Sequence, residues 1–231
     1  MRTLVLALLL ALTATAPAAA ASRNFGITGF DRIRVDGPFK VTLTTGIAPF
    51  ASATGSSAAL DRVAVEMQGR TLIVHANPSS WGGYPGEGVG PVEVQLGTHE
   101  LRAAWLNGSG TLQINRISGL LFDLAVQGSG SVDVAEADVD QLKVGLSGTV
   151  GSTIAGRAGM LKTTVRGIST LDASGLVTKD ATIGAQGAAT IRANVTNSAK
   201  IDATGPATVT LAGGPACTAQ LQGSASVSGC R

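Results

Sequence analysis

Apolar and polar residues alternate with a period of two along most of the second half of the chain. The alternation is clear over 122–126, continues over 132–134 after a Gly-Ser-Gly turn, and recurs over 142–146 and 183–193. Successive side chains of a β-strand point to opposite faces, so this pattern predicts strands joined by glycine corners, with their apolar side chains turned into one interior.

A short glycine-led phrase recurs through the same region, and its copies begin 18 to 21 residues apart. Self-similarity near 20 residues is typical of a stacked solenoid in which each repeat is one coil. We therefore predict an all-β chain that forms a single parallel β-solenoid (β-helix) of 18–21-residue coils, about six of them over residues 101–231. The copies are GSGTLQI (108–114), GSGSVDV (128–134), LSGTVGS (146–152), GISTLDA (167–173), GAATIRA (187–193), GPATVTL (205–211) and GSASVSG (223–229). The residues expected to point inward include Val126, Val132, Val144, Val165, Ile183, Ile191 and Leu221.

Glycine suits the corners because the chain turns sharply there while neighbouring coils stack about 4.8 Å apart. It reaches positive φ without a Cβ penalty, and a neighbouring Ser or Thr can satisfy corner amides. The structural corner glycines are predicted to be Gly108, Gly110, Gly128, Gly130, Gly148, Gly167, Gly187, Gly205 and Gly223.

The region before residue 101 has strands but lacks the glycine phrase. RIRVDG, FKVTLTTG, RVAVEMQG, RTLIVHAN and PVEVQLG alternate as strands do, and a Gly/Pro-rich loop spans 77–91. We predict an irregular N-terminal β region over 22–100, ahead of the regular coils of 101–231.

The first 21 residues are predicted to be a secretory signal peptide. Arg2 precedes the apolar run LVLALLLAL, and small residues follow up to an expected cleavage site near Ala20 or Ala21. No second apolar run of spanning length follows, so the mature chain is expected to lack a transmembrane span. We expect an exported protein, either periplasmic or extracellular at the cell surface.

Two cysteines, Cys217 and Cys230, lie near the C-terminus. In an exported chain an even number of cysteines favours a disulfide, and we expect this bond to clamp the last coil. Two cysteines without nearby histidine are too few for a metal site, so we predict no metal and no cofactor.

The segments FDRIRVDGPFKVTLTTG, RVAVEMQGRTLIVHAN and PVEVQL, followed by LNGSGTLQI, resemble in their order the bacterial auto-transporter adhesin, head GIN domain family. The resemblance covers residues 27 to 214. It implies a parallel β-solenoid and an adhesin-like role, and it brings no catalytic residues with it.

Composition and charge limit the ligands and the kinds of site that the chain is expected to have. Charged residues make up 14% of the chain and the net charge is +2, a balance that gives no reason to expect nucleic acid as a partner. The glycine phrases lack the pattern of a nucleotide site. Asp133 and Asp172 occupy equivalent coil positions, with Asp202 at a similar place. Gln113, Gly151, Arg192, Thr210 and Ser228 share this row, which favours a solvated strand face over a catalytic carboxylate row.

Candidate site residues are few. His75 and His99 have no recognisable acid partner, and no catalytic residue is predicted. Trp81 and Tyr84, in the Gly/Pro loop, could stack on sugar rings or could cover a solenoid edge. Trp105 is expected to pack where the two regions meet.

Two functions stay open. One is a non-enzymatic exported cell-envelope protein whose solenoid surface serves adhesion or scaffolding, with glycans or cell-surface or envelope proteins as partners. The alternative is a polysaccharide-binding protein or polysaccharide-cleaving enzyme on a β-helix scaffold.

Overall fold

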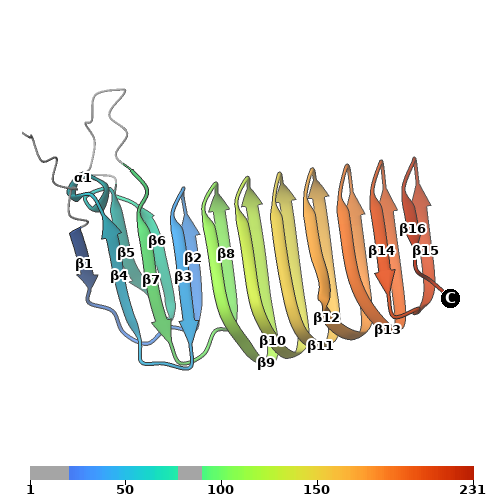
Figure 1. Cartoon of the computed structure of the whole chain (residues 1–231), viewed down its shortest axis with the longest axis horizontal. Coiled ribbons are helices and arrows are strands. Elements are labelled where there is room, and N and C mark those ends of the chain that lie inside the picture. Colours follow the sequence, from blue (N-terminus) through green and yellow to red (C-terminus); the bar gives the residue numbers. More distant parts are fainter. Residues whose placement is uncertain (1–20, 78–89) are drawn as a thin grey trace, which may run out of the picture.

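The chain forms an elongated stack of β coils with its C-terminus at one end (Figure 1). The structure is a computed structural model, and it describes residues 21–77 and 90–231. The predicted signal peptide therefore lies, but for Ala21, outside the described residues, as does most of the loop 77–91. The elements are β1 (Ala21–Phe25), β2 (Arg32–Asp36), β3 (Lys40–Thr45), β4 (Phe50–Gly55), α1 (Ser57–Leu60), β5 (Val63–Gln68), β6 (Thr71–Ala76), β7 (Glu93–Thr98), β8 (Ala103–Gly108), β9 (Thr111–Gly128), β10 (Ser131–Gly148), β11 (Gly151–Gly167), β12 (Thr170–Gln186), β13 (Thr190–Thr204), β14 (Thr208–Ala212), β15 (Ala216–Gln222) and β16 (Ser226–Ser228).

The predicted parallel β-solenoid is confirmed, with about six turns. Each long strand from β9 to β13 pairs in parallel with the next along nearly its whole length. Each of these strands bends midway, at the bottom of Figure 1. We therefore distinguish three parts of the surface of a coil. The post-corner face holds the segments that follow a glycine corner, such as 131–134. The pre-corner face holds those that lead into the next corner, such as 142–147. The connecting side, near 135–141, joins the two.

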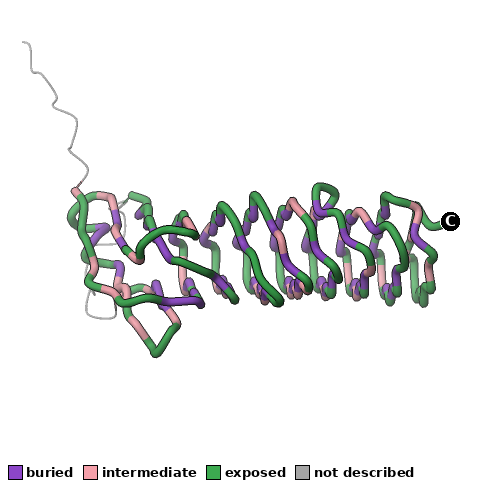
Figure 2. Tube along the Cα trace, turned by 90° about the horizontal axis from the view of Figure 1, so that it is seen from below, coloured by how far each residue is buried: buried purple, intermediate pink, exposed green. Residues whose placement is uncertain are grey.

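The core is a narrow column of Leu, Ile, Val and Ala side chains inside the coils. Buried and exposed residues alternate along the backbone, as Figure 2 shows. Val126, Val132, Val144, Val165, Ile183 and Ile191 are buried as predicted. Leu221 is an exception. It pairs with the buried Ala203, but its side chain is 47% exposed, because its coil is the last described and no later coil covers it.

The N-terminal coils are stacked out of sequence order. β2 pairs in parallel with both β6 and β8, and β3 pairs in parallel with both β7 and β9. The coil made by β2 and β3 therefore lies between the β6–β7 coil and the β8–β9 coil. Strand alternation alone does not predict this insertion, because it depends on pairing between segments far apart in the sequence.

The N-terminal end of the stack is covered by antiparallel strands. β4 pairs antiparallel with β7, β1 with β4, and β5 with β6. The short helix α1 begins after Ser56, whose side chain accepts a hydrogen bond from the Ala59 amide, and it lies at the same end (Figure 1). Antiparallel partners of this kind protect a solenoid end from pairing with other molecules.

The corner glycines form a column through the stack. The glycines of this column have positive φ, and each one after Gly37 approaches the backbone of the one before it. The register corrects one copy of the phrase. Gly148 pairs with Gly128, so the third copy is GTVGSTI (148–154), not LSGTVGS (146–152). Gly110 and Gly130 lack positive φ. A side chain on Gly130 is excluded instead by the Gly110 carbonyl oxygen, 2.6 Å from the β-carbon position. The column comprises Gly37, Gly108, Gly128, Gly148, Gly167, Gly187, Gly205 and Gly223.

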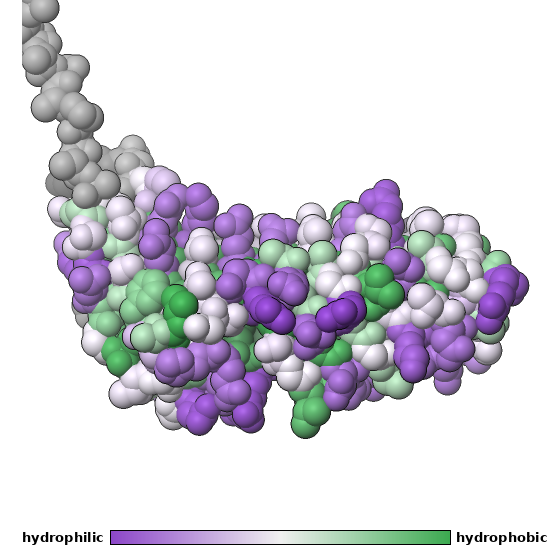
Figure 3. All heavy atoms as spheres, turned by 60° about the horizontal axis from the view of Figure 1, so that its bottom comes forward, coloured by the Kyte–Doolittle hydropathy of each residue, from purple (hydrophilic) through white to green (hydrophobic). Residues whose placement is uncertain are grey.

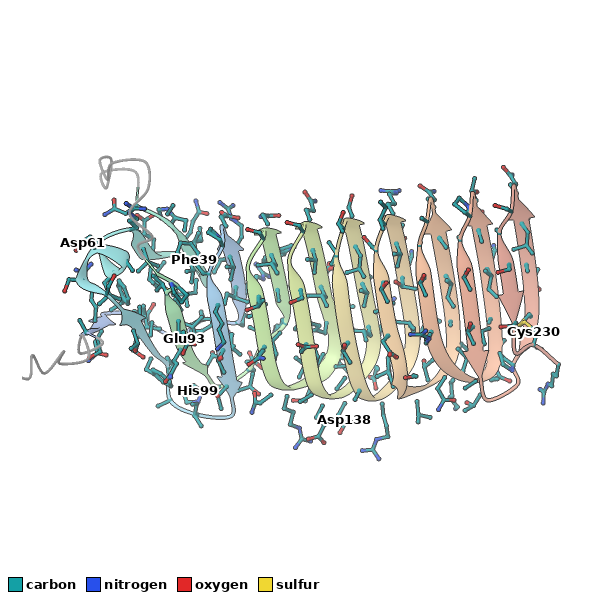
Figure 4. All side chains as sticks on the ribbon, turned by 45° about the horizontal axis from the view of Figure 1, so that its top comes forward. Phe39, Asp61, Glu93, His99, Asp138 and Cys230 are labelled. Carbon is teal, nitrogen blue, oxygen red and sulfur yellow. A yellow bond between two sulfur atoms is a disulfide. The ribbon has the colours of Figure 1, made fainter. Side chains whose placement is uncertain are left out.

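The predicted disulfide between Cys217 and Cys230 is confirmed, with 5.7 Å between their Cα atoms. Cys217 stands at the inward position that Ala199 and Ala181 occupy in the two preceding coils. Cys230 follows β16, where earlier coils would continue along the connecting side. The bond therefore closes the last coil into a covalent ring at the C-terminal end (Figure 4).

Candidate functional site: an outer cavity beside Trp105

A cavity of about 660 Å³ opens on the outside of the stack, where the pre-corner face meets the connecting side. The small side chain of Ala103 forms the floor of the cavity. It stands at the outward position between the longer side chains of Arg32 and Asp123 on neighbouring strands. It combines one aromatic ring, two leucines and four charged side chains, a mixture that no other described cavity has. The lining residues are Arg32, Glu100, Arg102, Ala103, Trp105, Ser118, Gly119, Leu120, Leu121 and Asp123.

Trp105 is half-buried on the outer surface of β8 and does not pack in the core. Its neighbours Ala104 and Leu106 are fully buried, so strand alternation turns the indole outward. Arg34 and Ala125 flank it on the adjacent strands. The alternation in the sequence AAWLNG could have given this position. The strand of Trp105 lies between β2 of the N-terminal region and β9 of the regular coils, which is the place expected from its position before the first glycine phrase, but the ring faces outward.

The charged rim of the cavity is held by a buried carboxylate. Asp31, whose side chain is 5% exposed, accepts a hydrogen bond at Oδ2 from Arg70 Nε at 3.0 Å. Arg102 Nε lies 3.8 Å from the same oxygen, and Arg32 Nε lies 4.0 Å from Oδ1. Arg102 also donates to Glu100 Oε1 at 3.0 Å. These contacts place Arg32 and Arg102 at the cavity edge, Arg102 through its hydrogen bond to Glu100 and Arg32 through a longer ion pair with Asp31.

The apolar wall of the cavity comes from the connecting side. Leu120 is 79% exposed and Leu121 is 42% exposed, next to Gly119 with φ of 127°. Figure 3 shows this side of the molecule, where hydrophobic residues stand singly among hydrophilic ones. The exposed leucines and the outward indole form an apolar half of the cavity, and the arginine and carboxylate side chains form a charged half.

This arrangement suits binding of an amphipathic ring-shaped ligand. An indole offers a broad apolar plane, and Arg, Asp and Glu side chains at its edge can donate and accept hydrogen bonds to hydroxyl groups. Sugars present both surfaces, one face of C–H bonds and a periphery of hydroxyls.

The other residues singled out in the sequence do not gather here. Trp81 and Tyr84 lie outside the described residues. His75 stands at the N-terminal end, with Nε2 3.4 Å from Glu66 Oε1. His99 lines a different hollow, with Thr45 and Arg116. Within 21–77 and 90–231, no three His, Cys, Asp or Glu residues are grouped as metal ligands.

The row containing Asp133 and Asp172 runs along the post-corner face, away from the cavity. Its members are one strand apart, with Thr153 and not Gly151 between the two aspartates, and Arg192 after them. Hydrogen bonds from the Ser174 hydroxyl and amide lower the pKa of Asp172, with a smaller effect from Arg192. A second hollow of about 440 Å³ lies over this face, lined by Thr42, Gln113, Asn115 and Asp133 among others.

Hydrogen bonds also hold Asp180 on the connecting side. Ser198 Oγ donates to its Oδ1 at 2.5 Å and Asn197 Nδ2 at 2.8 Å, both from the following coil. These bonds lower the pKa of Asp180. The carboxylate is exposed, so its contacts join two coils and do not build a site.

Fold and cavity together define a parallel β-solenoid protein with a cavity on its outer surface. The sequence matches the family described as "Putative auto-transporter adhesin, head GIN domain" over residues 29–215, and the chain belongs to that family. No protein among the curated ones matches the sequence.

Several solved structures share the fold. A putative adhesin from Bacteroides fragilis superposes with a TM-score of 0.80 at 17% identity, covering 91% of this chain and 96% of that one. A putative lipid binding protein from Parabacteroides distasonis has a TM-score of 0.70 at 18% identity, and a putative adhesin from Parabacteroides merdae has 0.67 at 18%; both alignments cover 90% of this chain and 95% of the other. At these identities the likeness concerns the fold.

Proposed function

We propose that the protein is an exported, non-enzymatic, adhesin-like solenoid that binds a glycan in the cavity at Trp105. The observation that carries this proposal is the outward indole beside exposed leucines and two arginines. A stacked solenoid exposes rigid outer faces and needs no moving part to bind a ligand along them. Membership of an adhesin family and the disulfide both support an exported protein. Among the described residues, no helix is long and apolar enough to cross a membrane.

The test is binding of the protein to a panel of oligosaccharides and polysaccharides, comparing wild type with Trp105→Ala. We expect Trp105→Ala to weaken the binding by about tenfold or more, because an aromatic stacking surface contributes on the order of 1 kcal/mol and the ligand also loses the apolar area that the indole covers. Ile168→Ala is the matched control, since Ile168 is an exposed apolar side chain at a corner away from the cavity, 69% exposed.

Two results would contradict the proposal. One is equal binding by wild type and Trp105→Ala with an unchanged melting temperature. The other is accumulation of new reducing ends in the same samples, which would identify the protein as a polysaccharide-cleaving enzyme.

A further inference from the structure

A row of lysines runs along the pre-corner face, parallel to the long axis of the stack. Lys143, Lys162 and Lys200 occupy the same register on β10, β11 and β13, and Thr182 takes that position on β12. Their neighbours along each strand are buried, so strand alternation directs all three ammonium groups outward.

The row is unfavourable for folding by itself. Lys143 and Lys162 are direct partners on neighbouring strands, and like charges so placed destabilise a sheet. In the part of the chain that the structure describes, neither lysine has a carboxylate within 4.0 Å. The connecting side is different, because there Asp138 lies 3.8 Å from Arg116 and 3.6 Å from Arg157 in neighbouring coils. An anion bound between the two lysines would offset their repulsion, and such a ligand would account for the pairing of like charges.

The row continues into the cavity at Trp105. Asp123, which lines the cavity, is the strand partner of Lys143 and the next member of the same row. Arg166 adds a fourth cation on this face, four residues after Lys162, and its Nε donates to Gln186 at 3.1 Å. Asp202 lies two residues after Lys200 on β13. Lys143, Lys162 and Lys200, with Arg166, therefore form a stretch of positive charge that starts next to Asp123 at the aromatic cavity and has Asp202 beside its last lysine.

We propose that the cavity and the lysine row form one extended site for an acidic polysaccharide, with the sugar chain lying along the long axis of the stack. This inference rests on the proposed glycan binding at Trp105 and adds the charge of the ligand. Coils are spaced about 4.8 Å apart, close to the length of one sugar unit in an extended chain, so successive carboxylates can meet successive coils. Each contact is a charge-assisted hydrogen bond, stronger than a neutral one.

A linear ligand fits this site better than a flat anionic surface does. The cations form a line on one sheet face, whereas the adjoining connecting side carries Glu136, Asp138 and Asp140 with Arg116 and Arg157 among them. A single sugar chain on the pre-corner face would contact the line of cations and would not meet those carboxylates, whereas a flat anionic surface would span both sides.

The experiment measures binding of polygalacturonate and of its fully methyl-esterified form, which keeps the sugar backbone and loses the charge. The test variant is Lys143→Gln with Lys162→Gln. The matched control is Lys179→Gln with Arg192→Gln, which removes the same charge from the connecting side and the post-corner face. Melting temperatures are measured alongside, and the test variant should melt no lower than wild type because it relieves a like-charge contact.

We expect wild type to bind the acidic polymer at least about tenfold more tightly than the ester. The test variant should lose about fivefold or more on the acidic polymer and little on the ester, and the control should match wild type. Raising the salt from about 0.05 M to about 0.5 M should weaken only the acidic interaction.

Equal binding of the two polymers, or equal losses in test and control variants, would overturn the inference. If Trp105→Ala still abolished binding in that case, the proposed glycan binding would stand. If no polymer or glycan bound at all, both the proposed glycan binding and the proposed extended site would be refuted. Capture of phosphatidylglycerol vesicles through Lys143 and Lys162, without capture of the polymer, would assign the row to a lipid surface.

Discussion

Gly148 lies directly over Gly128 in the stack, with φ of +115°, and a β-carbon on Gly148 would collide with the Gly128 carbonyl oxygen. The contact leaves room for hydrogen alone, and the positive φ disfavours any L side chain. The restriction on φ and the restriction on space act on the same residue, because the chain turns at Gly148 where it also packs against the corner of the preceding coil.

Replacement of Gly148 by alanine should therefore destabilise the protein by at least about 2 kcal/mol. Gly151, three residues on, is the matched control. It has no positive φ, and no atom lies within 4 Å of its β-carbon position. Gly151→Ala should leave stability unchanged or raise it by up to about 1 kcal/mol, because alanine restricts the unfolded chain. Denaturant melts of both variants check this, and equal losses would show that the corner is an ordinary turn.

The Cys217–Cys230 bond is expected to stabilise the last coil by roughly 3 kcal/mol, from the loop entropy of a segment with a sequence separation of 13. Cys217→Ser with Cys230→Ser should increase amide hydrogen exchange in β15 and β16. The coils before Ala193 should stay protected, because each coil contacts only its neighbours. Faster exchange throughout the stack would contradict this local role.

Thr163 is buried within the coil of β11, and its hydroxyl oxygen has no hydrogen-bond partner among the described residues. Thr163→Val keeps the shape and removes the unsatisfied hydroxyl, so it should stabilise the protein by about 1 kcal/mol. The adjacent Thr164 points outward, and Thr164→Val serves as the control, with an expected change of less than about 0.5 kcal/mol. A loss of stability in Thr163→Val would reveal a partner for the hydroxyl inside the coil.

The strand period and the corner glycines could be predicted because each regular coil repeats one local pattern. Three features were beyond that pattern. Leu221 has the inward alternation but belongs to the last described coil, where its side chain is 47% exposed. The LSGTVGS copy was placed two residues early, because Ser147-Gly148 matches Ser129-Gly130 in sequence, whereas the register pairs Gly148 with Gly128. The position of β2 and β3 between later segments depends on long-range pairing that alternation does not encode.

The site was harder to predict than the fold. Cys217 and Cys230 could be paired from compartment and number alone. The outward direction of Trp105 follows from its alternation with the buried Ala104 and Leu106, but the cavity beside it depends on segments far apart in the sequence. Lys143 and Lys162 are 19 positions apart, and only the register of β10 and β11 brings them together.

The hydrogen bonds from Ser198 and Asn197 lower the pKa of Asp180 in the folded state. A carboxyl group whose pKa is lowered by folding stabilises the protein when it is ionised. Its contribution is complete above the ordinary aspartate pKa of about 4 and is lost as the pH falls through the lowered value. Asp180→Ala should therefore melt below wild type at neutral pH, and the difference should shrink in acid. A difference in melting temperature that stayed constant down to about pH 2 would contradict this assignment.

The insertion of β2 and β3 between later coils constrains the order in which an emerging chain can fold. Residues 32–45 are synthesised early, but both of their neighbours in the stack, up to Ile114, follow much later. The first coil has no partner to pair with until then, so the N-terminal end cannot grow one coil at a time. Closing those long loops costs entropy before any pairing compensates it. The later coils need only the coil next to them in sequence, so the stack is expected to nucleate there and to complete its N-terminal end last.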